Sequence, residues 1–248
     1  VPFVYSGEQK RFPNGWFDAI VSPVPDDPRE NAVQSELIPT TVTRETVESA
    51  ASQHDRPEGR LWCAVVGGAS RSHRFADDDW SSLARGMNAL AQREGVRWLV
   101  TTSRRTGAHA ESILRDALDE STIADAIWWH DAPRRDLHAF LGMSELALVT
   151  QDSVTMVTEA VAAGRPVLAV RPNETEFPSG SFLPSYFARL EDNGRIERLR
   201  ADELKGWTNA PDAFHPIEGD PTLELSRRVL ERLGLTPAHH GPAGERPA

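Results

Sequence analysis

Apolar and polar residues alternate along this chain in two different periods. Short apolar runs without polar alternation, such as residues 61–66 and 147–149, suit strands that are buried on both faces of a sheet. Longer stretches between them carry apolar residues at helical spacing, as in residues 77–93, where Trp80 and Leu83 fall on one face. Strands that alternate with helices through short connections predict an α/β fold with a doubly wound parallel sheet.

The same periodicity gives the expected bounds of each element. Strands are expected at residues 1–5, 16–21, 61–66, 97–101, 126–129, 147–149 and 167–170. Helices are expected at residues 45–53, 77–93, 109–118, 136–143, 156–163, 182–191 and 223–233. Polar stretches rich in Pro and Gly divide the chain into a short α/β portion at 1–53, a linker at 54–60, a Rossmann-like domain at 61–235 and a disordered tail at 236–248.

The stretch at residues 147–170 predicts a strand, a polar turn, a helix and a second strand. The turn contains Asp152 and Ser153, which are small polar residues suited to capping a helix, and Gly164 ends that helix. Open parallel sheets bind ligands at the carboxyl ends of their strands. Because this turn follows a strand, it is the first candidate for a binding site.

Composition narrows the class of protein. Of the 248 residues, 39% are hydrophobic and 26% are charged, which is ordinary for a soluble globular protein. The net charge of −10 disfavours nonspecific binding to nucleic acid, so we expect no nucleic-acid partner. Cys63 is the only cysteine and lies in an apolar run, where a buried small hydrophobe is expected. No apolar run approaches the ~20 residues of a membrane span, and a cytoplasmic protein is expected.

Two other polar turns also follow strands, GGASRSHR after residue 66 and TTSRRTG after residue 100. In a parallel sheet, all three turns lie at one edge. Together they offer glycine amides, hydroxyl groups, arginines and a helix amino-terminus, which suit a phosphate or diphosphate. The candidate binding residues are Gly67, Gly68, Ser70, Arg71, Ser103, Arg104, Arg105, Thr106, Asp152, Ser153, Thr155 and Met156.

Each turn also has a simpler explanation. The glycines at 67–68 could form only a tight turn, the arginines at 104–105 a solvated pair, and Asp152 and Ser153 a helix cap. Three such turns at one edge favour a ligand site over these coincidences. Glu159 is either a solvated residue of the helix face or a carboxylate that accepts two hydrogen bonds from a ribose diol.

The segment SVTMVTEA, followed by GRP, resembles a block in the carboxyl-terminal domain of GT-B glycosyltransferases. Such domains often begin with a strand that ends in a Gly-Gly-Ser-like loop, as at residues 65–70 here. In the lipid-linked murein glycosyltransferases, the glutamate of this block holds the nucleotide ribose and the turn before it approaches uridine diphosphate. The resemblance therefore implies that Glu159 binds a ribose.

A closer resemblance is to the mitochondrial-fission ELM family. VVGGASRSHRF, LVTTSRRTG and VTQDSVTMVTEAVAAGRPV are similar to its three signature blocks, and FDAIVSPVPDD with a following Asn resembles its amino-terminal block. The resemblance runs from about residue 17 to about residue 194. The family is widespread in bacteria and is regarded as GT-B-like. This implies a nucleotide-sugar-binding carboxyl-terminal half at 61–235 and an acceptor-side amino-terminal domain at 1–53.

The amino-terminal block departs from the family pattern at Pro25, where the family has a histidine before the aspartate. This removes one candidate base and leaves Asp26 as the candidate catalytic residue. The segment before residue 61 is also about half of what a complete Rossmann-like domain needs. We expect the first strands and the Gly-rich opening of that domain to be absent, which would leave the acceptor site incomplete.

The resemblance implies sugar transfer from a nucleotide-diphosphate sugar to an unknown cell-envelope or lipid acceptor. Backbone amides and arginines, rather than a metal or another cofactor, would stabilise the leaving diphosphate. The acidic run at 77–79 suits a helix start better than a metal site, so no Asp-x-Asp metal motif supports a divalent ion. Peripheral association with the inner face of the membrane is an open alternative, and the sequence does not fix the oligomeric state.

The second function that the resemblance allows is not enzymatic. Plant members of the family are tied to the recruitment of a fission GTPase to mitochondria. A nucleotide pocket without a base would suit a fission-type adaptor or a nucleotide-binding scaffold.

Overall fold

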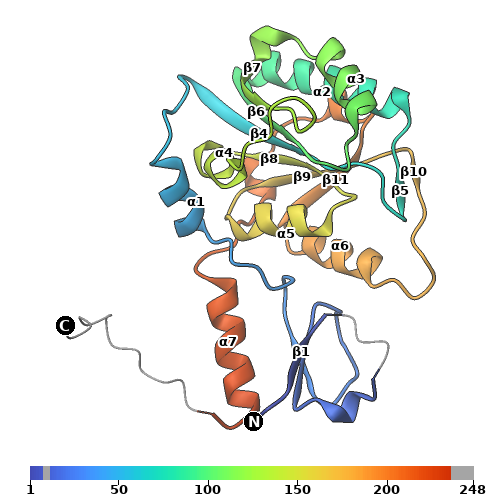
Figure 1. Cartoon of the computed structure of the whole chain (residues 1–248), viewed down its shortest axis with the longest axis vertical. Coiled ribbons are helices and arrows are strands. Elements are labelled where there is room, and N and C mark those ends of the chain that lie inside the picture. The colour runs from blue at the N-terminus through green and yellow to red at the C-terminus, as the bar shows by residue number, and fades with distance from the viewer. Residues whose placement is uncertain (8–11, 236–248) are drawn as a thin grey trace, which may run out of the picture. The chain divides into compact units, whose positions relative to one another are not determined.

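The computed structural model describes residues 1–7 and 12–235. The expected disordered tail at 236–248 lies outside the described residues. The chain forms two compact units, one of Thr40–Asp220 and one of Val1–Pro39 with Pro221–Ala248 (Figure 1). These bounds differ from the expected division at residues 53 and 61. The helix at residues 44–51 was expected in the amino-terminal portion but lies in the larger unit, and the helix at residues 221–232 was expected in the Rossmann-like domain but lies in the smaller unit.

A six-stranded parallel sheet forms the centre of the larger unit (Figure 1). Its strands are β4 (Arg60–Val66), β6 (Val96–Thr102), β7 (Ile123–Ile127), β8 (Ala147–Thr150), β9 (Val167–Arg171) and β11 (Ile196–Arg200). The spatial order is β11-β9-β8-β4-β6-β7. The chain therefore builds the sheet outward from β4 in one direction, then returns to β8 and builds it in the other. This confirms the doubly wound α/β fold that the sequence predicts.

Helices cover both faces of this sheet. Apolar residues of α2 and α3 join alternate residues of β4 and β6 in one core. The helices α4, α5 and α6 contact β4, β8, β9 and β11, and they lie on the other side of the sheet (Figure 1). The helices of this unit are α1 (Arg44–Ala51), α2 (Asp77–Glu94), α3 (Ala108–Ala117), α4 (Leu137–Met143), α5 (Val154–Ala162) and α6 (Leu183–Asp192), with the 3₁₀ turns η2 (Glu120–Thr122), η3 (Leu204–Gly206) and η4 (Pro211–Ala213).

Three tryptophans fill the core beneath α2. The Trp62 ring lies edge-on to Trp98, with ring centroids 5.6 Å apart, and to Trp207 at 6.2 Å. The indole N–H of Trp98 donates to the Met87 carbonyl of α2 at 2.9 Å. Burial of such large side chains dominates core stability, because each removes a large apolar area from water. The expected burial of Cys63 in the same strand is confirmed, and burial raises the pKa of its thiol.

Helix α1 belongs to the larger unit because it packs closely on α4. Gly142 of α4 makes this approach possible, since a Cβ at that position would lie 2.0 Å from the Val47 carbonyl oxygen. Arg44 of α1 also donates to the Gly164 carbonyl at 3.1 Å. Gly164 has φ of 68° and ends α5 in the left-handed conformation that glycine adopts readily.

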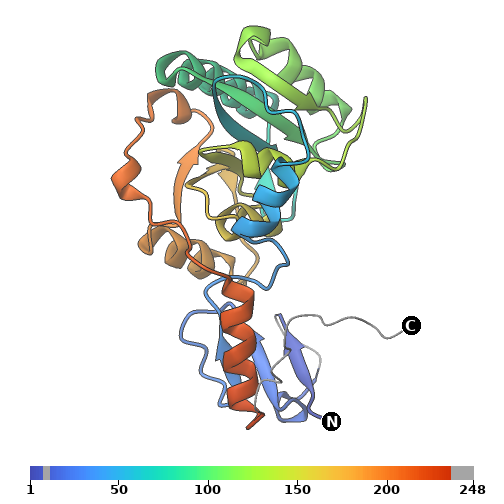
Figure 2. The ribbon, with the colours of Figure 1, turned by 90° about the vertical axis from the view of Figure 1, so that its left-hand side faces the viewer.

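The smaller unit is a three-stranded parallel sheet, ordered β1-β2-β3, with one helix against it (Figure 2). Leu225, Val229 and Leu233 pack against Ala19, Val21 and Val33 of the sheet. The helix therefore supplies one side of this core, although more than 180 residues separate it from the strands. The elements are β1 (Val4–Ser6), η1 (Asn14–Trp16), β2 (Ala19–Ser22), β3 (Ala32–Gln34) and α7 (Pro221–Arg232).

A short antiparallel ribbon of β5 (His73–Arg74) and β10 (Glu174–Thr175) extends from the larger unit. The His73 side chain is buried there, and its Nε2 atom has no hydrogen-bond partner among the described residues. Burial, with a smaller contribution from the charge of Arg171, lowers the pKa of His73 to about 4. The imidazole is therefore neutral in the folded protein at neutral pH.

This buried histidine makes stability sensitive to acid. As pH falls from the ordinary histidine value towards about 4, the unfolded chain binds a proton that the folded chain does not bind, so stability falls. Between about pH 7 and pH 5 the loss amounts to up to about 2 kcal/mol. Denaturant unfolding of His73→Gln should show a smaller loss over this interval than wild type. The exposed His109→Gln variant is the control, and an equal loss in both variants would contradict the assignment.

Candidate functional site

The three polar turns of the sequence meet at the carboxyl edge of the larger sheet. They follow β4, β6 and β8, and β4 lies between the other two strands. The Gly67 amide donates to the Thr150 hydroxyl at 2.6 Å, and the Thr106 hydroxyl donates to the Val66 carbonyl at 3.0 Å. The strand order reverses between β4 and β8, which is where open α/β sheets form their binding crevice.

The glycine pair after β4 is required by close packing of the turns. A Cβ on Gly68 would lie 2.0 Å from the Arg105 carbonyl oxygen, and one on Gly67 would lie 2.4 Å from the Asp152 carboxylate. Neither residue has a positive φ, so the requirement is space rather than backbone conformation. The pair therefore forms more than a tight turn, because it lets the turns after β6 and β8 close over β4.

Asp152 and Ser153 have separate roles in the turn after β8. The Ser153 hydroxyl accepts from the Met156 amide at 3.4 Å and caps α5. The Asp152 carboxylate instead accepts from the Gly68 amide at 2.9 Å and pairs with Arg105 at 3.0 Å. Its side chain is 0% exposed, whereas that of Arg105 is 40% exposed. Burial raises the pKa of Asp152, against the opposing effects of the Gly68 hydrogen bond and the Arg105 charge.

Glu159 lies half-buried on α5, beyond the turn. Burial raises the pKa of its carboxyl group, and the opposing charge comes from His138 in the first turn of α4. Among the described residues, no hydrogen bond joins the Glu159 side chain to the three turns. Glu159 is thus placed beside a neighbouring helix on the same face of the sheet rather than within the loop network, and its carboxylate has unused acceptor capacity.

The remaining candidate residues divide into those that shape the turns and those that reach solvent. The Ser70 hydroxyl accepts from the His73 amide at 3.2 Å, and the Ser103 hydroxyl accepts from the Arg105 amide at 3.2 Å. Arg104 and Thr155 are exposed. Arg71 lines a separate cavity of about 320 Å³ beside the β5–β10 ribbon. The structure therefore does not gather all candidates around one point.

A buried carboxylate that the sequence analysis did not single out anchors the end of β6, where the second polar turn begins. Glu111 of α3 accepts from the Thr102 hydroxyl at 2.5 Å and from the His130 amide at 3.2 Å. Thr102 in turn accepts from the Trp129 amide at 2.8 Å. These bonds join the ends of β6 and β7 to α3. Glu111 lies three residues before Leu114 and therefore near the inward face of α3. This spacing is the sequence signal from which the burial of Glu111 could have been predicted.

In the smaller unit, Asp26 lies exposed in the loop after β2 with φ of 50°, which is uncommon for a residue other than glycine. The neighbouring Asp27 is held by Arg29, whose Nε donates to it at 2.9 Å, and by the Ser22 hydroxyl. The hydrogen bonds from Arg29 lower the pKa of Asp27 to about 2. The sequence analysis did not foresee this pair, which fixes the loop that carries Asp26.

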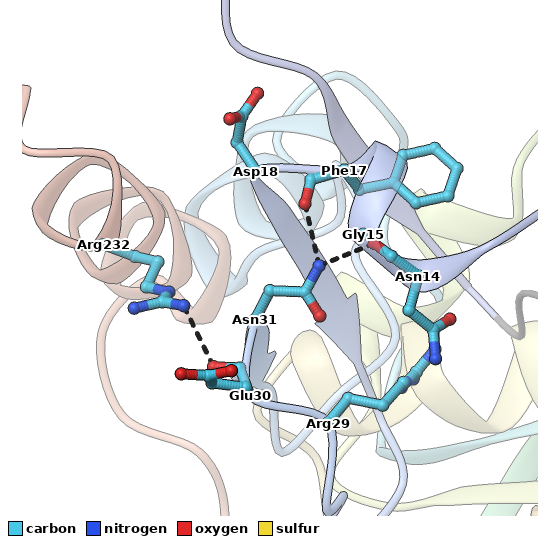
Figure 3. Close-up of a pocket in the computed structure, with 8 residues that line it drawn as sticks. All are labelled: Asn14, Gly15, Phe17, Asp18, Arg29, Glu30, Asn31 and Arg232. Atoms are coloured by element: carbon cyan, nitrogen blue, oxygen red, sulfur yellow. Dashed lines mark hydrogen bonds between the residues drawn. The ribbon is translucent and has the colours of Figure 1, made fainter.

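A cavity of about 380 Å³ opens at the opposite edge of the small sheet (Figure 3). Asn31 donates to the carbonyls of Asn14 and Phe17 at 2.9 and 2.8 Å, and Arg232 of α7 donates to the Glu30 carbonyl at 3.0 Å. These residues precede β2 and β3, so the cavity lies at the amino ends of the strands. Since ligands of parallel sheets bind at the carboxyl ends, this cavity is not the candidate site.

The fold and its carboxyl edge define a doubly wound α/β protein with three polar loops around the switch point of the sheet. The family model for mitochondrial fission ELM1 matches residues 9–215. Because the match covers more than half of the chain, the chain belongs to that family, which confirms the resemblance seen in its motifs.

Several solved structures are similar to parts of the chain at low sequence identity. MurG from Acinetobacter baumannii is 16% identical with a TM-score of 0.46, over 95% of this chain and 60% of that one. WaaG, a glycosyltransferase involved in lipopolysaccharide biosynthesis, is 13% identical with a TM-score of 0.44, over 88% and 59%. A glycosyl transferase of family 9 from Veillonella parvula is 13% identical with a TM-score of 0.41, over 66% and 43%. At these values the likeness carries no argument about activity.

The chain spans 43% to 60% of the length of these three structures. No curated protein matches the chain. None of the helices in residues 1–7 and 12–235 is long and apolar enough to cross a membrane.

Proposed function

We propose that the protein binds a nucleotide-diphosphate sugar at the three loops around β4 and transfers the sugar without a metal ion, as a GT-B-like glycosyltransferase. The observation that carries this proposal is the pair of donors formed by the Gly68 amide and Arg105. They already hold an oxyanion, the Asp152 carboxylate, at 2.9 and 3.0 Å. A phosphate oxygen has the same requirement for a backbone N–H and a guanidinium.

The chemistry of the proposal follows from these donors. Sugar transfer from a nucleotide diphosphate leaves negative charge on the departing diphosphate. An amide and a guanidinium at a fixed position stabilise that charge as it develops, which lowers the barrier to bond breaking. Glu159 would accept hydrogen bonds from the ribose, and the resemblance of its sequence block to that of GT-B glycosyltransferases supports this role. Asp26 of the smaller unit is the candidate base for the acceptor hydroxyl.

Thermal unfolding with a panel of ligands tests the donor site directly. Uridine, guanosine, adenosine and cytidine diphosphates and their sugar conjugates are each added with excess chelator. A ligand at about 100 times its dissociation constant adds roughly 2.7 kcal/mol of stability. A rise in melting temperature with one nucleotide, maintained in chelator, is the expected result. No shift with any nucleotide would overturn the proposal.

The Glu159→Ala variant tests the ribose contact. Loss of a charged hydrogen-bond acceptor should weaken binding of the identified nucleotide about tenfold. Binding of inorganic diphosphate, which has no ribose, should be unchanged. Calorimetric titration measures both affinities, with Glu120→Ala as the control for removal of a carboxylate at an exposed position. Equal loss of both ligands would assign Glu159 to the fold of the site instead.

Pro25 favours a second candidate function, a non-enzymatic adaptor or nucleotide-binding scaffold. The family pattern has a histidine at this position, so the chain lacks one group that could remove a proton from an acceptor. Release of nucleoside diphosphate from the bound sugar nucleotide in the presence of membrane and envelope extracts separates the two functions. Turnover lost in Asp26→Asn supports the enzyme. Tight binding with no turnover supports the scaffold.

A further inference from the structure

The Asp152 carboxylate lies inside the proposed binding site, but the proposed reaction gives it no role. Its carboxylate occupies the two donors that the proposed function assigns to a phosphate, the Gly68 amide and Arg105. One oxygen, Oδ2, takes both contacts. The other, Oδ1, is buried without a hydrogen-bond partner in the described part of the chain. The site is therefore filled by an anion that belongs to the protein itself.

A bound phosphate and a charged Asp152 cannot share these donors. A phosphate oxygen within hydrogen-bond distance of Gly68 and Arg105 would stand where Oδ2 stands now, against a second negative charge. Arg105 can follow the ligand, because its side chain is 40% exposed and its loop borders solvent. The Asp152 side chain, at 0% exposed, has no such freedom. Ligand binding would thus strip a buried carboxylate of the Gly68 amide and of Arg105, and would leave it only neutral contacts such as that with Thr150.

The energetic consequence of that exchange is large. A charged carboxylate that is buried without a cation beside it is strongly destabilising, and uptake of a proton removes that penalty. The charged group that faces Asp152 from the packed elements is Arg105, and the other contacts come from the neutral groups of Gly68 and Thr150. Once Arg105 turns to the ligand, no cation remains against the carboxylate. Burial already holds the pKa of Asp152 above its usual range.

We propose that Asp152 is an internal competitor of the ligand, and that anion binding at Gly68 and Arg105 is coupled to the uptake of one proton by Asp152. This inference rests on the proposed function for the location of the ligand. The proton comes from solvent, and no covalent bond changes. Affinity for an anion then rises as pH falls, by up to tenfold per pH unit for one proton taken up. The rise ends below the pKa of Asp152 in the free protein, where the group is already neutral.

Sulfate is a suitable probe, because its charge does not change between about pH 5 and pH 8. Calorimetric titration in two buffers of different ionisation enthalpy counts the protons taken up per sulfate bound. Wild type should take up close to one proton at the upper end of this range. Asp152→Asn should take up none, and should bind sulfate at least about tenfold more tightly at that pH, because the competing charge is gone. Asp202→Asn, which changes an exposed carboxylate paired with Arg200, should match wild type.

The outcomes distinguish this inference from the proposed function. Sulfate and nucleotide binding with no proton uptake, at an affinity that Asp152→Asn leaves unchanged, would overturn the coupling and leave the donor site standing. Binding of neither ligand by wild type or variant would overturn both. The proton count of wild type needs no substitution, so the inference is tested even where Asp152→Asn does not fold.

Discussion

Replacing Gly68 with alanine is expected to abolish measurable nucleotide binding. The added methyl group would lie 2.0 Å from the Arg105 carbonyl oxygen and 2.7 Å from the Thr106 amide. Because both atoms belong to the backbone, the loop after β6 must move and take Arg105 with it. The phosphate of the nucleotide would then lose its hydrogen bonds from the Gly68 amide and from the Arg105 guanidinium. This corresponds to more than about 100-fold in affinity.

Calorimetric titration and thermal unfolding together check this prediction. The overpacked loop should also lower the free energy of unfolding by about 1–3 kcal/mol, so binding is measured well below the melting temperature of the variant. Gly206→Ala is the matched control, because a Cβ there meets nothing within 4 Å and lies in the same unit. Wild-type affinity and stability in Gly68→Ala would show that the turn does not have the proposed geometry.

Replacing Trp98 with alanine is expected to produce the largest loss of stability. The side chain is 0% exposed, packs on Trp62 and bonds to the Met87 carbonyl of α2. Deletion of a buried tryptophan costs about 3–5 kcal/mol, a large share of the 5–15 kcal/mol that stabilises a typical domain. The melting temperature should fall by about 6–20 °C for a unit of this size.

The matched control for this prediction is Trp129→Ala, since Trp129 is 38% exposed. It should change the free energy of unfolding by less than about 1 kcal/mol. Denaturant unfolding at a single pH measures both variants. A similar loss of unfolding free energy in the two variants would mean that Trp98 contributes no more to stability than an exposed tryptophan.

The strands of the larger sheet were predictable where they are apolar on both faces. Residues 61–66 and 167–170 have no polar position, so periodicity alone places them in the interior. In contrast, β11 has the sequence IERLR, and its charged residues conceal a strand that lies at the edge of the sheet beside β9. β3 has only three residues after a Pro- and Asp-rich loop, too few for a pattern to develop.

The candidate site was predictable to the level of loops, not of contacts. The topology of a parallel sheet brings the turns after β4, β6 and β8 to one edge, whatever their side chains do. Which partner each polar group selects depends on the burial of that group. Asp152 and Ser153 are equally good helix caps in sequence, yet only Ser153 caps α5, while Asp152 reaches across to Gly68. No local pattern encodes a contact 84 residues away.

The helix α7 gives the chain an order of assembly during synthesis. The strands β1, β2 and β3 are made before Thr40–Asp220, but the residues that cover Ala19, Val21 and Val33 are made after it. Nascent domains generally fold in the order of synthesis, so the larger unit can complete its core while the small sheet still lacks its helix. The strands of the small sheet are thus made before the larger unit but receive their apolar cover after it, so synthesis of the larger unit separates the two halves of one core.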